Sequence, residues 1–325
     1  MTLLLQADDL ERAFPVRLGL RGLFQRGPKP LVRALAGVSL RITRGRTLAV
    51  VGESGCGKST LARALVRLVG LDGGQILYEG EDVLALRGDA LRRYNRRVQM
   101  VFQDPYGSLN PRMTAGEMLG EVLRVHRIVP RPDIPARITE LLALVGLPAD
   151  AADRLPKAFS GGQRQRLAIA RALAVDPAVL IADEIVSALD VSIQAQILNL
   201  LLDMQERLGL AMLFVSHDLR VVRHLAHEVA VMYLGRVVEF GSADAIFDTP
   251  QHPYTQALLR AAPVLTPQRR TTESALRGEL PSPMRVVPGC PFHPRCPAVF
   301  DRCRTEPPAL LIRDGHATAC HLMDA

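Results

Sequence analysis

The chain has 325 residues, of which 48% are hydrophobic, so it can bury a sizeable core, and disorder over most of its length is excluded. The net charge of +7 permits contact with a phosphate ligand, an anionic lipid surface or nucleic acid and selects none of them. Because tryptophan is absent and aromatics are only 4%, nothing favours a base-stacking surface, and we expect no nucleic-acid partner.

The sequence shows neither of the two apolar segments that direct proteins into or across membranes. No run of 18 or more apolar residues is present, so we expect no membrane span. The start, MTLLLQADDLER, lacks the basic region of a signal peptide. We therefore expect the chain to remain in the reducing cytoplasm, where structural disulfides are rare.

The first half of the chain predicts short strands followed by helices. Residues 1–50 have the pattern of strands and turns, and residues 47–51, TLAVV, form a brief apolar run typical of a buried strand. We expect a helix at about 58–69. Residues 75–103 are mixed and end in a second apolar strand, VQMVFQ. From residue 104 proline and helical periodicity increase, which predicts an inserted helical subdomain at about 104–175.

The second half alternates helices with apolar strands, which predicts a mostly parallel sheet covered on both faces. No long internal repeat is visible, so we expect one nucleotide-binding unit. After about residue 262 the sequence becomes proline-rich and irregular, and we predict a nucleotide-binding domain at 1–262 and a C-terminal extension at 263–325. The predicted elements are helices at 163–175 and 191–208, strands at 178–183 and 211–216, and a hairpin at 229–240 turned by Gly235.

The segment after the first apolar strand fits the pattern GxxxxGK[ST] of a phosphate-binding loop. Its glycines let backbone N–H groups point at phosphates, and the helix that follows adds a field that favours anions. Lys58, one of only three lysines, supplies a charge for the β/γ-phosphates, and Ser59 can ligate Mg²⁺. The alternatives are a glycine-rich turn and, for Cys56, either a reactive thiol or a small residue in a tight loop. The predicted ATP contacts here are Gly52, Glu53, Ser54, Gly55, Cys56, Gly57, Lys58, Ser59 and Thr60.

Polar side chains stand where the other apolar strands end. Asp183 and Glu184 follow the strand at 178–183, where α/β sheets bind ligands, so Asp183 can hold Mg²⁺ and Glu184 can polarise a water. The alternative is an acidic cap between strand and loop. His217 is a candidate to contact the γ-phosphate, and Gln103 to reach Mg²⁺ or the attacking water. We predict that Glu184 and His217 are catalytic and that Ser59, Gln103 and Asp183 are Mg²⁺ ligands.

A second glycine-rich segment indicates which class of phosphate-loop proteins the sequence resembles. Residues 159–166, FSGGQRQR, resemble the signature of ABC transporter ATPases, and residues 187–190, SALD, look like the D-loop of that family. Gln103 and His217 match its Q-loop and switch histidine. Phe14 lies where the family places an aromatic residue that stacks on adenine, although it is equally consistent with a core position. The resemblance covers about residues 8–260.

The resemblance implies a fold and a mode of ATP binding. The fold is α/β, a P-loop (RecA-like) ABC ATPase core with an N-terminal antiparallel β subdomain, an inserted helical subdomain and an irregular Cys-rich C-terminal extension. ATP would lie between two ATPase chains, because the phosphate loop of one faces the signature of the other. A hydroxyl and glycine N–H groups at a helix N-terminus suit a second anion site. The residues implied are Ser160, Gly161, Gly162, Gln163 and Asp190.

Three further segments resemble the oligopeptide/dipeptide/nickel branch of the family. They are residues 103–112, residues 252–255 and the tail from Pro288, and the sequence is most similar to the second ATPase of dipeptide importers. The branch implies a related partner ATPase, two transmembrane permease subunits and, indirectly, a substrate-binding protein. In one departure, Ile185 stands where the branch has a proline, which frees φ and restores an N–H.

Four of the five cysteines fall in the last part of the chain with the spacing C-x5-C-x6-C-x16-C. Unconnected thiols remain an alternative to a metal site. Close C-x2–4-C pairs, usual in zinc sites, are missing, whereas four thiolates also suit a 4Fe-4S cluster. The resemblance points to 4Fe-4S, and nearby histidines keep zinc as the alternative. The predicted ligands are Cys290, Cys296, Cys303 and Cys320.

The sequence as a whole predicts an ATPase that powers uptake of dipeptides or oligopeptides from the cytoplasmic face of the cell membrane, as a peripheral subunit that uses ATP and Mg²⁺. An importer ATPase for nickel or another small solute is the first alternative. A non-transport ABC ATPase and a regulatory module without turnover are the others. Glu184 and His217 argue against the regulatory module.

Overall fold

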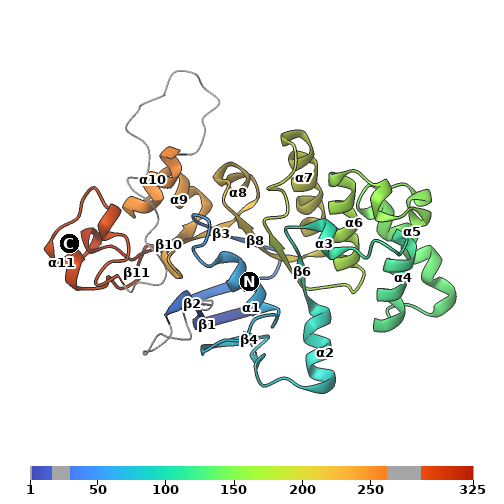
Figure 1. The fold of residues 1–325 in the computed structure, drawn as a ribbon, viewed down its shortest axis with the longest axis horizontal. Helices are drawn as coiled ribbons and strands as arrows, with labels where there is room; N and C mark the ends of the chain where they lie inside the picture. Colours follow the sequence, from blue (N-terminus) through green and yellow to red (C-terminus); the bar gives the residue numbers. More distant parts are fainter. Residues whose placement is uncertain (1, 17–29, 262–286, 325) are drawn as a thin grey trace, which may run out of the picture. The chain divides into compact units, whose positions relative to one another are not determined.

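The computed structural model describes residues 2–16, 30–261 and 287–324 (Figure 1). The chain divides into two compact units. Unit 1 consists of Met1–Leu5, Ile42–Thr47 and Leu77–Ser216. Unit 2 consists of Gln6–Arg41, Leu48–Ile76 and His217–Ala325. The described part of the C-terminal tail therefore belongs to the same unit as the predicted phosphate loop, although more than 200 residues separate them in the sequence.

The sheet of unit 1 is parallel. It contains β6 (Val98–Val101), β7 (Val179–Asp183) and β8 (Ala211–Ser216), with β7 between the other two. Every residue of β7 and β8 is buried. Continuous apolar runs are what parallel strands need when helices cover both faces, so the strands predicted near 178–183 and at 211–216 are confirmed.

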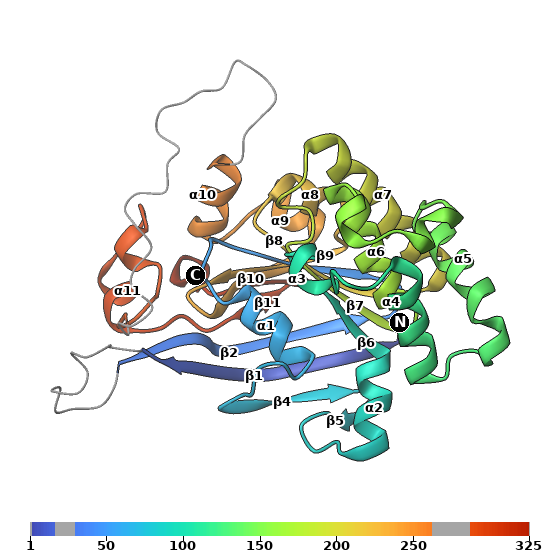
Figure 2. The same cartoon turned by 45° about the vertical axis from the view of Figure 1, so that its right-hand side comes forward.

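Helices make up most of the rest of unit 1, and α4, α5 and α6 pack against one another (Figure 2). A capping box starts α4, because Thr114 Oγ1 accepts from the Glu117 N–H at 3.2 Å and Glu117 Oε2 accepts from the Thr114 N–H at 2.8 Å. These three helices lie within the range 104–175 for which the sequence predicts helices. The remaining elements of unit 1 are β5 (Glu81–Asp82), α2 (Gly88–Arg97), α3 (Pro105–Ser108), α4 (Ala115–His126), α5 (Ile134–Leu144), α6 (Gly161–Leu173), α7 (Val191–Leu208) and three 3-10 turns at Arg131–Asp133, Ala149–Asp153 and Pro156–Ala158.

The predicted hairpin near 229–240 forms the middle of unit 2. Its strands β9 (Glu228–Tyr233) and β10 (Arg236–Ser242) are antiparallel and turn at Gly235, whose φ is 77°. Strand β3 (Thr47–Val51) runs parallel to β9, and in a second sheet β1 (Leu3–Pro15) lies between β2 (Leu31–Thr43) and β4 (Gly73–Tyr78). The helices are α1 (Lys58–Leu65), α8 (Leu219–Leu225), α9 (Ala243–Asp248), α10 (Pro253–Ala261) and α11 (Asp301–Thr305), with 3-10 turns at His293–Arg295 and His321–Met323.

The tail is more regular than the sequence predicts. Strands β11 (Leu311–Arg313) and β12 (His316–Thr318) form a hairpin, and β12 pairs with β10 through Glu239 and Thr318. The turn residues Asp314 and Gly315 have φ of 52° and 78°, as a two-residue type I′ turn requires. The Asp-Gly pair is a strong hairpin signal, and the expectation of an irregular extension overlooked it.

None of the helices within the described ranges is both long enough and apolar enough to cross a lipid bilayer.

Glu239 connects the tail to the hairpin of unit 2. Its side chain is fully buried on β10 and accepts from the backbone N–H groups of Gln251 at 2.7 Å and His252 at 3.1 Å. The imidazole Nε2 of His316, on β12, lies 2.7 Å from Glu239 Oε1. One carboxylate therefore serves three polar groups that the fold removes from water, and this requirement explains a charge in the core.

Replacing Glu239 with alanine should leave these groups without an acceptor. We expect Glu239→Ala to lower the free energy of unfolding by about 3–5 kcal/mol, because a buried charge network loses its central member. Urea unfolding followed by circular dichroism measures the change. The control is Glu306→Ala, which removes an exposed tail carboxylate paired with Arg302 and should cost less than about 1 kcal/mol. Equal losses in the two variants would contradict the assignment.

Candidate nucleotide-binding site

The phosphate loop of unit 2 joins β3 to α1, and two of its glycines are fixed by close backbone contacts. The backbone has φ of 151° at Gly52 and 111° at Gly57. A Cβ atom on Gly52 would lie 2.2 Å from the carbonyl oxygen of Met232, and one on Gly57 would lie 2.1 Å from that of Ala34. Because no side chain fits at either position, packing requires glycine at both places where the GxxxxGK[ST] pattern has it.

Lys58 is the first residue of α1 and folds back over the loop. Its Nζ donates to the carbonyl oxygens of Gly52 at 2.8 Å and Glu53 at 3.0 Å, and the side chain is buried. The first turn of α1 contains no acidic residue, so the helix N-terminus has no built-in anion of its own. A buried ammonium group at the N-terminus of a helix without an acidic first turn suits a phosphate group.

Cys56 is a packing residue of the loop. It is 1% exposed, and burial raises the pKa of its thiol despite the opposing charge of Lys58. Its carbonyl oxygen accepts from the Gly235 N–H at 2.8 Å, which ties the loop to the turn between β9 and β10. The structure therefore favours the small buried residue over the reactive thiol.

In unit 1 the predicted catalytic carboxylate contacts a second predicted site residue. Asp183 ends β7 and is 1% exposed, and Glu184 follows it. The side-chain amide of Gln103 donates to Glu184 Oε2 at 3.0 Å, although 81 residues separate them. The Glu184 N–H donates to the carbonyl oxygen of Val215 on β8 at 3.0 Å. The two residues predicted to act on the attacking water are thus brought together.

Glu184, which precedes Ile185, has an unusual backbone conformation. The φ of Glu184 is 50°, in the left-handed region, which costs a non-glycine residue about 1–3 kcal/mol. A proline at position 185 would drive Glu184 towards extended backbone instead. Ile185 is 2% exposed and Val186 is 3% exposed, so both anchor the segment in the core. With Ile185 at this position, Asp183 still ends β7 and Glu184 still follows it.

The predicted signature forms the start of α6. Ser160 Oγ accepts from the Gln163 N–H at 3.3 Å, and Gln163 Oε1 accepts from the Ser160 N–H at 3.0 Å. The hydroxyl hydrogen of Ser160 can still be donated to an anion. Ser160 and Gly161 are exposed, whereas a Cβ on Gly162 would lie 2.5 Å from Ile193 on α7. Asp190, the N-cap of α7, is also exposed.

His217 and Phe14 lie in unit 2. His217 is exposed and directly follows β8. Phe14 is partly exposed near the end of β1, and the guanidinium of Arg12 lies 4.7 Å from its ring centroid. One ring face is therefore in use, so the role of Phe14 in adenine stacking stays a prediction, as does contact of His217 with the γ-phosphate.

The four tail cysteines are neighbours in unit 2. The Cys290 N–H donates to the carbonyl oxygen of Cys303 at 2.8 Å. Burial and then the thiols of Cys303, Cys320 and Cys296 raise the pKa of Cys290 to about 11. All four are free thiols. Among the residues described, however, no three His, Cys, Asp or Glu side chains are grouped to hold a metal ion. The cluster assignment stays a prediction.

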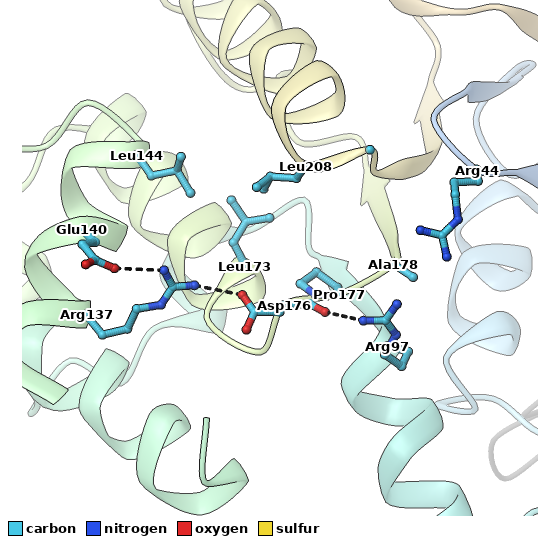
Figure 3. Close-up of a pocket in the computed structure, with 11 residues that line it drawn as sticks. Arg44, Arg97, Arg137, Glu140, Leu144, Leu173, Asp176, Pro177, Ala178 and Leu208 are labelled. Atoms are coloured by element: carbon cyan, nitrogen blue, oxygen red, sulfur yellow. Dashed lines mark hydrogen bonds and ion pairs between the residues drawn. The ribbon is translucent and has the colours of Figure 1, made fainter. Parts of the chain in front are cut away.

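A cleft of about 340 Å³ in unit 1 is a separate feature (Figure 3). In it Arg137 bridges Glu140 at 3.1 Å and Asp176 at 2.9 Å, and Arg97 donates to the Asp176 carbonyl oxygen at 3.0 Å. The cleft also includes Ala178, just before β7 begins, whereas Asp183 and Glu184 lie where β7 ends. It is therefore not the nucleotide site.

Two residues contact the phosphate loop without having been predicted as site residues. Tyr254, on α10, accepts the Glu53 N–H through its hydroxyl at 2.9 Å. Arg295, in the tail, pairs with the Glu53 carboxylate at 2.6 Å. The only sequence signal was the resemblance of residues 252–255 and of the tail to the importer branch, and that signal assigns no contact.

The sequence matches two family descriptions. "ABC transporter" matches residues 35–187, and "Oligopeptide/dipeptide transporter, C-terminal region" matches residues 238–303. The probable peptide ABC transporter ATP-binding protein y4tS of Sinorhizobium fredii is 53% identical over 320 residues, which cover 98% of this chain and 90% of that protein. The chain belongs to the ABC transporter family of ATP-binding proteins.

Further relatives of this ABC protein agree in sequence and in fold. The dipeptide transport ATP-binding protein DppF of Escherichia coli is 50% identical, covering 99% of this chain and 95% of that protein. The structure of cbiO1 from Clostridium perfringens has a TM-score of 0.64 at 27% identity and covers 77% of this chain and 92% of cbiO1. The cassette MJ0796, a dimer bound to ADP and phosphate, has a TM-score of 0.63 at 27% identity, covering 74% and 98%. The mixed α/β ABC ATPase fold is confirmed.

The burial of Cys56 predicts low reactivity. Because Cys56 is 1% exposed and burial raises the pKa of its thiol, we expect N-ethylmaleimide to modify Cys56 at least about tenfold more slowly in the native ABC protein than in urea. Peptide mapping of the alkylated chain measures each cysteine separately. Rapid native labelling of Cys56 at pH 7 would show that the loop opens readily.

Proposed function

We propose that this ABC ATPase powers the uptake of dipeptides or oligopeptides through an importer. The main support is the identity of 50–53% over nearly the whole chain to proteins named for peptide transport. The match of residues 238–303 to the C-terminal region of oligopeptide/dipeptide transporters supports it independently. Neither observation selects one peptide, because the cargo would be chosen by other subunits.

ATP would be held by the phosphate loop, with Mg²⁺ bound by the polar residues that the sequence predicts as its ligands. Lys58 would contact the β/γ-phosphates from its position over Gly52 and Glu53. Ser59, Gln103 and Asp183 supply the oxygen ligands that Mg²⁺ prefers, and the buried Asp183 carboxylate fits that role. When bound, Mg²⁺ neutralises charge that develops on the phosphates.

Hydrolysis would depend on Glu184. Its carboxylate can accept a proton from an attacking water, and the hydrogen bond from Gln103 fixes the position of Oε2. If Gln103 turns towards nucleotide, this bond breaks and the carboxylate becomes available to water. His217, which follows β8, would contact the γ-phosphate and would lose that contact when the phosphate leaves.

The exposed signature supports assembly with a second ATPase. Ser160 and Gly161 face solvent at the N-terminus of α6, where a nucleotide bound to another chain can reach them. The family resemblance favours a related but different partner chain. Two permease subunits and a substrate-binding protein would complete the importer, with this chain bound peripherally at the cytoplasmic face of the membrane.

Glu184→Gln tests the function directly. In the assembled importer we expect unchanged ATP binding, ATP hydrolysis lowered by roughly 10²–10⁴-fold, and loss of dipeptide uptake into proteoliposomes. Phosphate release and uptake of a radiolabelled dipeptide give the two rates. The control is Glu121→Gln, an exposed change on α4 that should leave both rates within about twofold. Full hydrolysis by Glu184→Gln would show that this residue is not part of the mechanism. Uptake of nickel but not of peptides would show that the transported substrate is nickel.

We also infer that Cys290, Cys296, Cys303 and Cys320 hold a 4Fe-4S cluster, with zinc as the alternative. The support is their proximity, four free thiols in one part of unit 2, and the reducing compartment expected for the chain. The described thiols are not grouped as a finished site, so binding would have to draw them together.

Metal analysis distinguishes the alternatives. Anaerobically purified protein should be brown and contain about four irons per chain, as a four-thiolate cluster requires. Replacing Cys303 with serine should remove the iron, whereas Cys56→Ser should not, because Cys56 is buried in the phosphate loop. Colourless protein with one zinc per chain would favour the zinc site, and protein without either metal would leave four structural thiols.

A further inference from the structure

One buried ion pair connects the C-terminal tail to the phosphate loop. The guanidinium of Arg295 contacts both oxygens of the Glu53 carboxylate, at 2.6 Å and 3.0 Å. The Arg295 side chain is 5% exposed, and that of Glu53 is 24% exposed. A bidentate pair of this kind is specific in geometry and stronger than a neutral hydrogen bond.

The backbone of Glu53 contacts Lys58, which is predicted to bind phosphate, and Tyr254. Its carbonyl oxygen accepts from Lys58 Nζ at 3.0 Å, and its N–H donates to the Tyr254 hydroxyl at 2.9 Å. Three groups therefore fix one residue of the loop: Arg295 its side chain, Lys58 its carbonyl and Tyr254 its amide. A shift of the Glu53 carboxylate would move the loop beside Lys58.

An aromatic cluster holds Arg295 in place. The rings of Tyr233, Tyr254 and Phe292 pack with centroid distances of 4.7 to 5.4 Å, and the Arg295 guanidinium lies 6.0 Å from the Tyr233 centroid. Phe292 belongs to the tail, and the Arg295 N–H donates to its carbonyl oxygen at 3.0 Å. The tail thus approaches the loop as a packed structure.

Electrostatics gives this contact a direct effect on nucleotide binding. An unpaired Glu53 carboxylate would place negative charge in the loop that has to accept the negative phosphates. We propose that Arg295 is a positioning residue of the nucleotide site, which neutralises Glu53 and thereby sets the affinity for ATP. The proposal rests on ATP binding by the phosphate loop, the first part of the proposed function.

Titration calorimetry with MgATP on the full chain tests the proposal, in a Glu184→Gln background that prevents turnover. Arg295→Gln should weaken ATP binding by about 10–100-fold, since one partner of a buried charge pair is lost. The double variant Glu53→Gln/Arg295→Gln should recover most of that loss, because the repelling charge is gone. Arg295→Lys, which keeps the charge without the fork, should lie between the wild type and Arg295→Gln. The control is Arg302→Gln, which removes an exposed tail pair and should change affinity less than about twofold.

A role limited to folding predicts a different result. Loss of structure alone would lower the fraction of chain that binds ATP and leave the Kd of the folded fraction unchanged, whereas an unpaired Glu53 raises that Kd. In the assembled importer with Glu184 intact, Arg295→Gln should raise the KM for ATP and leave kcat at saturating ATP within about threefold. Unchanged affinity in Arg295→Gln, or no recovery in the double variant, would overturn the proposal. Should Arg295→Gln not fold, the same comparison is made with Arg295→Lys, alone and with Glu53→Gln. A wild-type chain that binds no ATP would instead refute the proposed function.

Discussion

The phosphate loop has to run in direct contact with two other backbone segments, and the architecture of unit 2 follows from that constraint. At Gly52 and Gly57 no Cβ atom can be accommodated against the carbonyls of Met232 and Ala34. These contacts place the loop beside the end of β9 and beside β2, so the strands must be positioned before the loop can take its shape. The positions of the two glycines in the sequence pattern are therefore required by the packing of β2 and β9 against the loop.

Much of this arrangement could be predicted from the sequence, because local signals and distant packing agree. The apolar runs at 178–183 and 211–216 are too continuous for half-exposed strands, and they are buried strands. The helix expected at 191–208 has those bounds. The contact between Gln103 and Glu184 also follows, since residues at the ends of neighbouring parallel strands lie close together.

Other features depend on partners that no local pattern identifies. Arg295 is one of many arginines in a basic chain, and nothing in its neighbourhood indicates that it pairs with a residue of the phosphate loop. Glu239 is similar, because a lone acidic residue in a strand normally predicts an exposed position. The tail hairpin differs, since Asp314 and Gly315 did indicate a turn and the proline-rich surroundings concealed it.

The distance along the chain between Glu53 and Arg295 has a consequence for biosynthesis. The phosphate loop leaves the ribosome early, but its ion-pair partner follows 242 residues later. At about 5–20 residues per second, roughly 10–50 s pass between the synthesis of the two residues. During that time the nascent loop lacks the contact that neutralises Glu53. A chain whose translation stops before residue 295 never acquires it, so the order of synthesis places the completed loop among the last parts of this unit to form.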